Sequence, residues 1–147
     1  MSVLVERSFV VPVAVEAAWQ LLADVEDWPA WAPHIRSVEL EPPGGLGPTS
    51  RGRFRLRGAP ASSFSMLTYD PPRHWSWAGS VAGMRVTYDH RFGSEGPSAT
   101  RITFVVEGHG PISRLVGRPF AWIYGRNLDR AIPRLIDRYR RVASGST

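Results

Sequence analysis

The stretch ISRLVGRPFAWIYGRNLDRAIPRLIDRYRRV, residues 112–142, predicts one long amphipathic helix. Its apolar side chains recur at alternating steps of three and four residues, which places them on one face of a helix. Arginine and aspartate side chains fall mostly on the other side, so we expect one buried face and one hydrated face. The apolar residues are Leu128, Ile132, Leu135, Tyr139 and Val142.

The same apolar arc, projected toward the start of the helix, brings Gly117, Ala121 and Tyr124 to the inward side. Small side chains there leave room either for a neighbouring backbone or for a ligand, and close packing on a sheet is the commoner arrangement. Pro133 cannot donate a hydrogen bond to the carbonyl of Asp129, so we expect the helix to kink at this point.

The residues before this helix predict one strand, two short helices and then six strands. Residues 2–11 alternate as a strand does, and helical spacing follows over residues 15–23 and 24–31. Clusters rich in glycine and proline then separate the strands at residues 42–45, 58–60, 70–72, 81–83 and 93–97. The six strands are expected at residues 34–41, 51–57, 62–69, 74–79, 84–92 and 99–107.

Short links between consecutive strands predict antiparallel neighbours in one meandering sheet. The long helix is the one large amphipathic element available to cover the apolar face of that sheet. The order of elements therefore predicts an α+β fold, in which a curved sheet grips the C-terminal helix. We expect residues 1–147 to form a single domain.

Composition excludes several classes of chemistry. The 147 residues include no cysteine, and all 18 basic residues are arginine, so thiolate nucleophiles and lysine Schiff bases are absent. No apolar run is long enough to span a membrane, and the first residues do not resemble a secretion signal, so a cytoplasmic protein is expected. The histidines and carboxylates are too scattered to predict a metal site.

Several stretches resemble one known family. They are WPAWAPHI at residues 28–35, GRF at 52–54, YDPPRHWSW at 69–77, and His90-Arg91 followed by a turn containing Gly108. Together they resemble the polyketide cyclase/dehydrase-like proteins of the START and Bet v 1-like (SRPBCC) superfamily. The resemblance implies a helix-grip fold with seven antiparallel strands and an internal cavity for polyketides, lipids or other bulky apolar molecules. The resemblance does not specify a single activity. We expect no cofactor.

The strand at residues 84–92 supplies the best candidates for chemistry. Alternate residues face the same side of a sheet, so His90 and Tyr88 should point toward the helix. A histidine can take or give a proton near neutral pH, and a tyrosine hydroxyl can bond a ligand carbonyl, so the pair would suit ring closure or dehydration. The alternative is that both are ordinary core residues, which is the commoner case.

Other inward positions are candidates for ligand contact, although each would equally suit a packed core. Trp75 and Trp77 share one face of their strand and offer large flat surfaces to an apolar ligand. The remaining histidines are weaker candidates, since the facing of His34 is unclear and His74 lies opposite the tryptophans. The full set of expected ligand-binding residues is Trp75, Trp77, Met84, Val86, Phe92, Phe104, Gly117, Ala121 and Tyr124.

Arginines at four-residue spacing form a row on the predicted helix: Arg126, Arg130, Arg134 and Arg138. A hydrated surface is the ordinary explanation for such a row, although the net charge of +5 also permits an anionic partner such as a membrane surface or RNA. No motif predicts specific nucleic-acid binding. Trp122 and Ile123 fall outside the apolar arc, and the chain is expected to be a monomer or a homodimer.

Three functional hypotheses remain from the sequence. The first is binding of a small hydrophobic molecule, polyketide-like or lipid-like, between sheet and helix. The second is a cofactor-free polyketide cyclase or dehydratase that uses His90 and Tyr88. The third is an interaction module that docks an anionic partner through the arginine row.

Overall fold

The computed structural model describes residues 2–58 and 61–145. The predicted order of elements is confirmed, and their ends differ from expectation by two residues or fewer. The turn expected at residues 58–60 lies partly outside the described residues. In chain order the elements are β1 (Ser2–Val11), α1 (Val15–Ala23), the 3₁₀ helix η1 (Val25–Ala30), β2 (Ile35–Glu41), β3 (Arg51–Leu56), β4 (Ser62–Asp70), β5 (His74–Val81), β6 (Met84–Ser94), β7 (Thr100–His109) and α2 (Ser113–Ala143).

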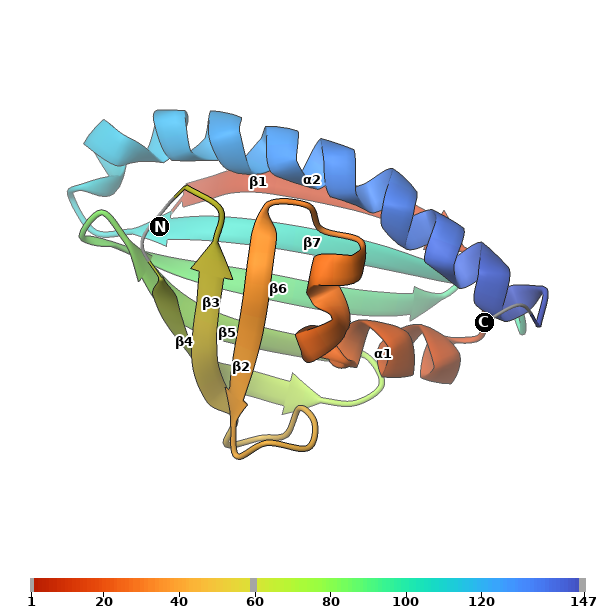
Figure 1. Ribbon diagram of the computed structural model, residues 1–147. Helices are drawn as coiled ribbons and strands as arrows, with labels where there is room; N and C mark the ends of the chain where they lie inside the picture. Colours follow the sequence, from red (N-terminus) through yellow and green to blue (C-terminus); the bar gives the residue numbers. More distant parts are fainter. Residues whose placement is uncertain (1, 59–60, 146–147) are drawn as a thin grey trace.

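All seven strands belong to one antiparallel sheet with the order β1-β7-β6-β5-β4-β3-β2. Strands β2 to β7 follow one another across the sheet because their links are short. The last of them, β7, pairs with β1, while α1 and η1 carry the chain from β1 at one edge to β2 at the other (Figure 1). This arrangement is the predicted helix-grip fold.

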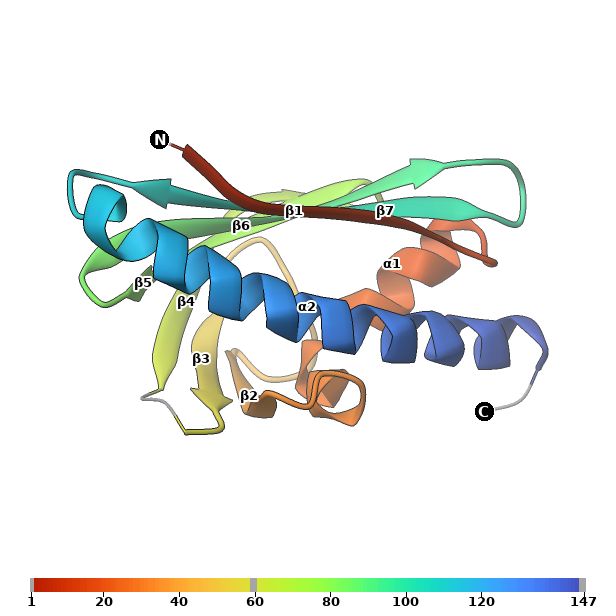
Figure 2. The same ribbon diagram turned by 90° about the horizontal axis from the view of Figure 1, so that it is seen from above.

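The sheet curls around α2, and two glycines make the tight part of the curl possible. A Cβ atom at Gly52 would lie 2.0 Å from the carbonyl oxygen of Glu39, and one at Gly79 would lie 2.8 Å from that of Ser63. Any side chain would collide with the neighbouring strand at these positions, so they require glycine. Figure 2 shows α2 lying across the open side of the curled sheet.

Helix α2 packs closely on β1 at Gly117. A Cβ atom at Gly117 would lie 3.2 Å from Leu4 Cδ2, so this position serves the close approach of helix and strand. Farther along, Arg7 on β1 forms an ion pair of 2.7 Å with Asp129 on α2. Helix α2 continues through Pro133 without interruption and curves over the sheet in Figure 1.

Candidate functional site

A cavity of about 270 Å³ lies between the inner face of the sheet and the N-terminal half of α2. Strands β3 to β6, the segment from η1 to the start of β2 and residues 120–127 of α2 contribute to its wall, which is mostly apolar. The lining residues are Trp28, His34, Ile35, Phe54, Leu56, Ser62, Ser63, Phe64, Trp77, Val81, Tyr88, His90, Phe120, Ile123, Tyr124 and Asn127.

Packed aromatic rings form one wall of the cavity. The Trp28 indole is fixed by a hydrogen bond of 2.8 Å from its Nε1 to the carbonyl of Leu22, which ties η1 to α1. Its ring centroid lies 5.5 Å from that of Trp77, and Trp77 lies 4.4 Å from Phe64. Each ring is held by its neighbours, so this wall is rigid and its shape is set before any ligand arrives.

His90 is buried beside this wall and stacks on Trp75, with ring centroids 4.3 Å apart. Burial lowers the pKa of His90 to about 3, so the imidazole is neutral at physiological pH. Its Nδ1 lies 3.3 Å from the carbonyl oxygen of Trp75. Because a carbonyl only accepts, we assign the proton to Nδ1, which leaves Nε2 as a hydrogen-bond acceptor.

Tyr88 on β6 and Tyr124 on α2 pack against each other in the cavity wall, with ring centroids 5.7 Å apart. Burial raises the pKa of both tyrosines well above the usual value, so both hydroxyls stay protonated and can donate.

Polar groups in the cavity lack partners within the protein. Among the described residues, neither tyrosine hydroxyl nor Nε2 of His90 forms a hydrogen bond. Within residues 2–58 and 61–145, the fully buried side-chain polar atoms without a partner are Nδ1 of His34 and Nε1 of Trp75. The tyrosine hydroxyls and Nε2 of His90 are therefore not sealed in protein, and they are free to bond a ligand in the cavity.

His34 also lines the cavity, although strand alternation left its direction unassigned. It precedes β2, whose pairing with β3 shifts register between Ile35 and Ser37, so simple alternation could not assign its direction. Burial lowers its pKa to about 4, which keeps this second imidazole neutral as well. The one available signal was its place in the family-like stretch at residues 28–35.

The residues expected to contact a ligand divide into two groups. Trp77, Tyr88, His90 and Tyr124 line the cavity, and Phe104 lines a smaller adjoining hollow. The others lie elsewhere, either in the packed core or against a neighbouring element. They are Trp75, Met84, Val86, Phe92, Gly117 and Ala121.

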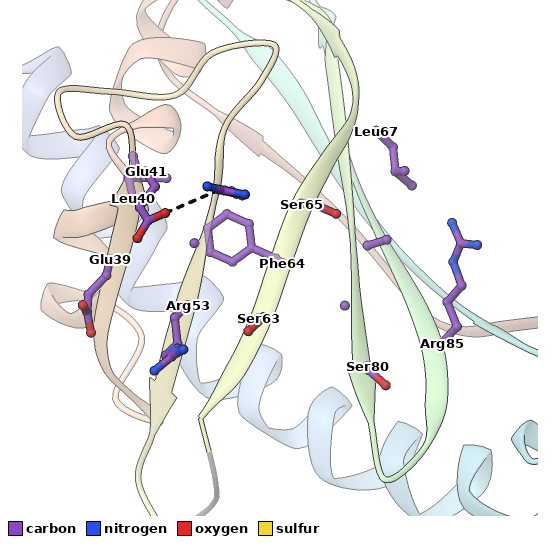
Figure 3. Close-up of a pocket in the computed structure, with 14 residues that line it drawn as sticks. Glu39, Leu40, Glu41, Arg53, Ser63, Phe64, Ser65, Leu67, Ser80 and Arg85 are labelled. Carbon is purple, nitrogen blue, oxygen red and sulfur yellow. Dashed lines mark ion pairs between the residues drawn. The ribbon is translucent and has the colours of Figure 1, made fainter.

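A larger hollow of about 780 Å³ lies on the outer face of the sheet (Figure 3). Its small side chains, Ser63, Ser65 and Ser80, lie between charged residues such as Arg53 and Arg85. It is open to solvent, and an ion pair of 3.4 Å joins Arg51 to Glu41 at its side. The wall of this open trough is more polar than that of the inner cavity, so the inner cavity is the better candidate site for a hydrophobic ligand.

The arginines of the predicted row on α2 differ in the contacts that they make. Arg138 forms an ion pair with Asp27, and the Arg126 guanidinium lies over the Trp122 ring, 4.9 Å from its centroid.

Within residues 2–58 and 61–145 no cluster of three or more histidines and carboxylates is placed to hold a metal ion. No helix in the described part of the chain is long and apolar enough to cross a membrane.

Comparison with protein families identifies one whose model matches nearly the whole chain. The model of the family described as "Polyketide cyclase / dehydrase and lipid transport" matches residues 2–140. None of the curated proteins matches the chain in sequence.

Three solved structures illustrate the similarity in fold. The Zhui aromatase/cyclase from a Streptomyces strain has a TM-score of 0.72 at 16% identity, over 97% of this chain and 98% of that one. A START superfamily protein from Mycobacterium smegmatis has a TM-score of 0.66 at 18% identity, over 94% and 97%. A conserved protein from Geobacillus kaustophilus has a TM-score of 0.65 at 14% identity, over 92% and 94%. At these identities the likeness shows the fold alone.

Proposed function

This chain belongs to the polyketide cyclase/dehydrase and lipid transport family, and from that premise we propose that it binds a small polyketide-like or lipid-like molecule between sheet and α2. The observation that carries the proposal is an apolar cavity holding neutral polar groups without protein partners. These groups open onto an apolar cavity, and a few convergent polar groups in such a cavity are typical of a ligand-binding site.

The size and polarity of the cavity limit the ligand. Its volume of about 270 Å³ is near the lower end of common ligand pockets, roughly 300–1,000 Å³, which favours a few fused rings over a whole phospholipid. The tyrosine hydroxyls can donate to a ligand carbonyl, and Nε2 of His90 can accept from a ligand hydroxyl. A neutral, aromatic, hydroxylated ketone would satisfy both kinds of group.

Cofactor-free cyclisation or dehydration is the second candidate function. It is favoured by the presence of His90 and Tyr88 in the same cavity, each with a polar group available to a ligand. The low pKa of His90 makes it a weak proton acceptor near neutral pH, so catalysis would depend more on hydrogen bonding and cavity shape than on general base chemistry. For this reason we place ligand binding first.

Native mass spectrometry of freshly purified protein, with extraction and identification of any adduct, is the first test. Titrations with naphthol and naphthalene then measure the contribution of one ligand hydroxyl. We expect the wild type to prefer naphthol about tenfold, and His90→Leu to lose that preference, because one hydrogen bond contributes about 0.5–1.5 kcal/mol. His74→Gln, altered on the outer face where His74 pairs with Asp89, is the control and should retain the preference.

Failure to bind either compound, together with the absence of any adduct, would refute the binding proposal. A hydroxyl preference that persists in His90→Leu would refute the assignment of His90 as the acceptor. The cyclase alternative predicts a further result, namely that His90→Gln binds a reactive poly-β-ketone normally but turns it over about 100-fold or more slowly.

A further inference from the structure

The N-terminal half of α2 carries an apolar stripe that no described element covers. Its exposed members are Ile112, Leu115, Pro119, Trp122 and Ile123, which we call the α2 stripe. Steps of three and four residues place them along one side of the helix. Leu115 and Trp122 are 79% and 64% exposed. Single exposed apolar residues are common, but a continuous stripe of large exposed apolar side chains is not.

Positive charge borders the α2 stripe and no negative charge offsets it. Arg114, Arg118 and Arg126 are exposed on the same half of α2, and no aspartate or glutamate occurs between Glu107 and Asp129. Within the described chain none of these three arginines forms an ion pair with a carboxylate. The surface is therefore both apolar and cationic.

The α2 stripe lies beside the entrance of the inner cavity. Ile123 belongs to the stripe and also lines the cavity, next to Phe120. At the start of the helix, the Ile112 side chain approaches the turn between β5 and β6, 3.4 Å from the position of a Cβ at Gly83. Val81, which ends β5, lines the cavity as well. A surface pressed against the stripe would thus be continuous with the cavity wall.

Charge decides which partner suits this surface. A second copy of the chain, docked stripe to stripe, would bring arginines together without a nearby carboxylate, which is unfavourable. An anionic bilayer offers apolar acyl chains and negative headgroups at the same boundary, where tryptophan is favoured. We propose that the α2 stripe docks the protein on anionic membranes and so places the cavity entrance at the bilayer surface.

The docking geometry follows from the helix. Leu115 and Trp122 enter the boundary between headgroups and acyl chains, while Arg114, Arg118 and Arg126 bind the headgroups around them. Docking itself is independent of the proposed ligand. Only its consequence, transfer of an apolar molecule between bilayer and cavity, rests on the proposed function.

Co-sedimentation with vesicles tests the docking. We use phosphatidylcholine vesicles with and without about 30% phosphatidylglycerol, a content that gives a clearly negative surface. The wild type should bind the anionic vesicles, and added salt should weaken the binding. Arg118→Gln should weaken it about fivefold, and Trp122→Ala about tenfold. Arg134→Gln, an exposed arginine on the C-terminal half of α2, is the matched control and should bind within about twofold of the wild type.

Fluorescence locates the contact, because Trp122 is the exposed tryptophan among the six. The other five are 7% exposed or less. Iodide should quench Trp122 in the free protein, anionic vesicles should protect it, and brominated lipids should quench it instead. Trp122→Phe should remove all three effects.

Three results would overturn the proposal: absence of binding to anionic vesicles, equal binding to neutral vesicles with no loss in Trp122→Ala, and self-association that shields Trp122 from iodide before vesicles are added. The cavity variant His90→Leu should bind vesicles as the wild type does. Loss of vesicle binding in the stripe variants, with naphthol binding retained, separates failure of docking from failure of ligand binding.

Discussion

The two halves of α2 lie on the same sheet but meet different surroundings. The C-terminal half is sealed, since Ala131, Leu135 and Tyr139 are fully buried. The Tyr139 hydroxyl donates a hydrogen bond of 2.6 Å to the carbonyl of Ala18 in α1. The N-terminal half borders the cavity, where the Tyr124 hydroxyl has no partner among the described residues.

Helix α1 accounts for the difference. It inserts Trp19 against the sheet at one end of the inner face, where the Trp19 ring lies 5.1 Å from that of Trp75 and 5.3 Å from that of Phe92. At the other end, beside the N-terminal half of α2, the inner face borders the cavity instead. The same amphipathic pattern therefore gives a packed core where Trp19 of α1 fills the space, and borders a cavity whose lining does not include Trp19.

The largest expected difference between the halves concerns core packing. Leu135→Ala should lower the free energy of unfolding by about 2–5 kcal/mol, because it leaves a void in the sealed half. Ile123→Ala, a comparable truncation of a side chain that is 56% exposed, should cost about 1 kcal/mol or less. Urea unfolding measures both changes. Similar costs would mean that the N-terminal half is as tightly packed as the C-terminal half.

Acid should destabilise the protein through the cavity histidines. The pKa of His90 is about 3 in the folded protein and about 6.5 when unfolded, so the unfolded chain binds more protons between these values. Stability should therefore be lost as pH falls from about 6.5 toward 3, with a slope of up to about 1.4 kcal/mol per pH unit from His90.

The second cavity histidine should add to this loss, because the pKa of His34 is lowered in the same direction, to about 4. Urea unfolding at a series of pH values measures the slope. His90→Gln should make it shallower, whereas Tyr88→Phe, which removes no group that titrates in this range, should not. An unchanged slope in His90→Gln would contradict the burial of a neutral imidazole.

Removing one tyrosine hydroxyl from each half of α2 compares the two environments through the loss of a single oxygen atom. Tyr139→Phe should destabilise by about 1–3 kcal/mol, because the buried carbonyl of Ala18 loses its bond to the hydroxyl. Tyr124→Phe should change stability by less than about 0.5 kcal/mol, because its hydroxyl bonds no described residue. Thermal unfolding measures both, and the reverse ranking would contradict the assignment of the two environments.

A small effect is expected at the boundary between the halves. Arg7 and Asp129 are joined across β1 and α2 by an exposed ion pair, with side chains 37% and 58% exposed. Arg7→Gln should cost only about 0.2–1 kcal/mol, and added salt should reduce the difference, since exposed pairs are screened. Urea unfolding at low and high salt measures this effect. A cost of several kcal/mol would mean that the pair, and not the core, holds α2 to the sheet.

Sequence periodicity predicted the inner face of the sheet well but could not locate the cavity along it. Trp75 and Trp77 share one face by alternation, and both are buried. Only Trp77 lines the cavity, because Trp75 lies nearer Trp19 of α1. Alternation reports the side on which a residue lies and contains no information about the element that covers it.

The sequence by itself determined the order of elements, the antiparallel meander, the buried stripe of α2, the inward direction of Tyr88 and His90, and the resemblance to the family. These depend on local spacing and on turn residues, which a single chain displays directly. Only the tertiary structure decided the position of the cavity, the entry of His34 into its wall, and the neutral state of both imidazoles. Each depends on desolvation and packing by residues distant in sequence, chiefly η1, α1 and α2, and no local pattern encodes those contacts.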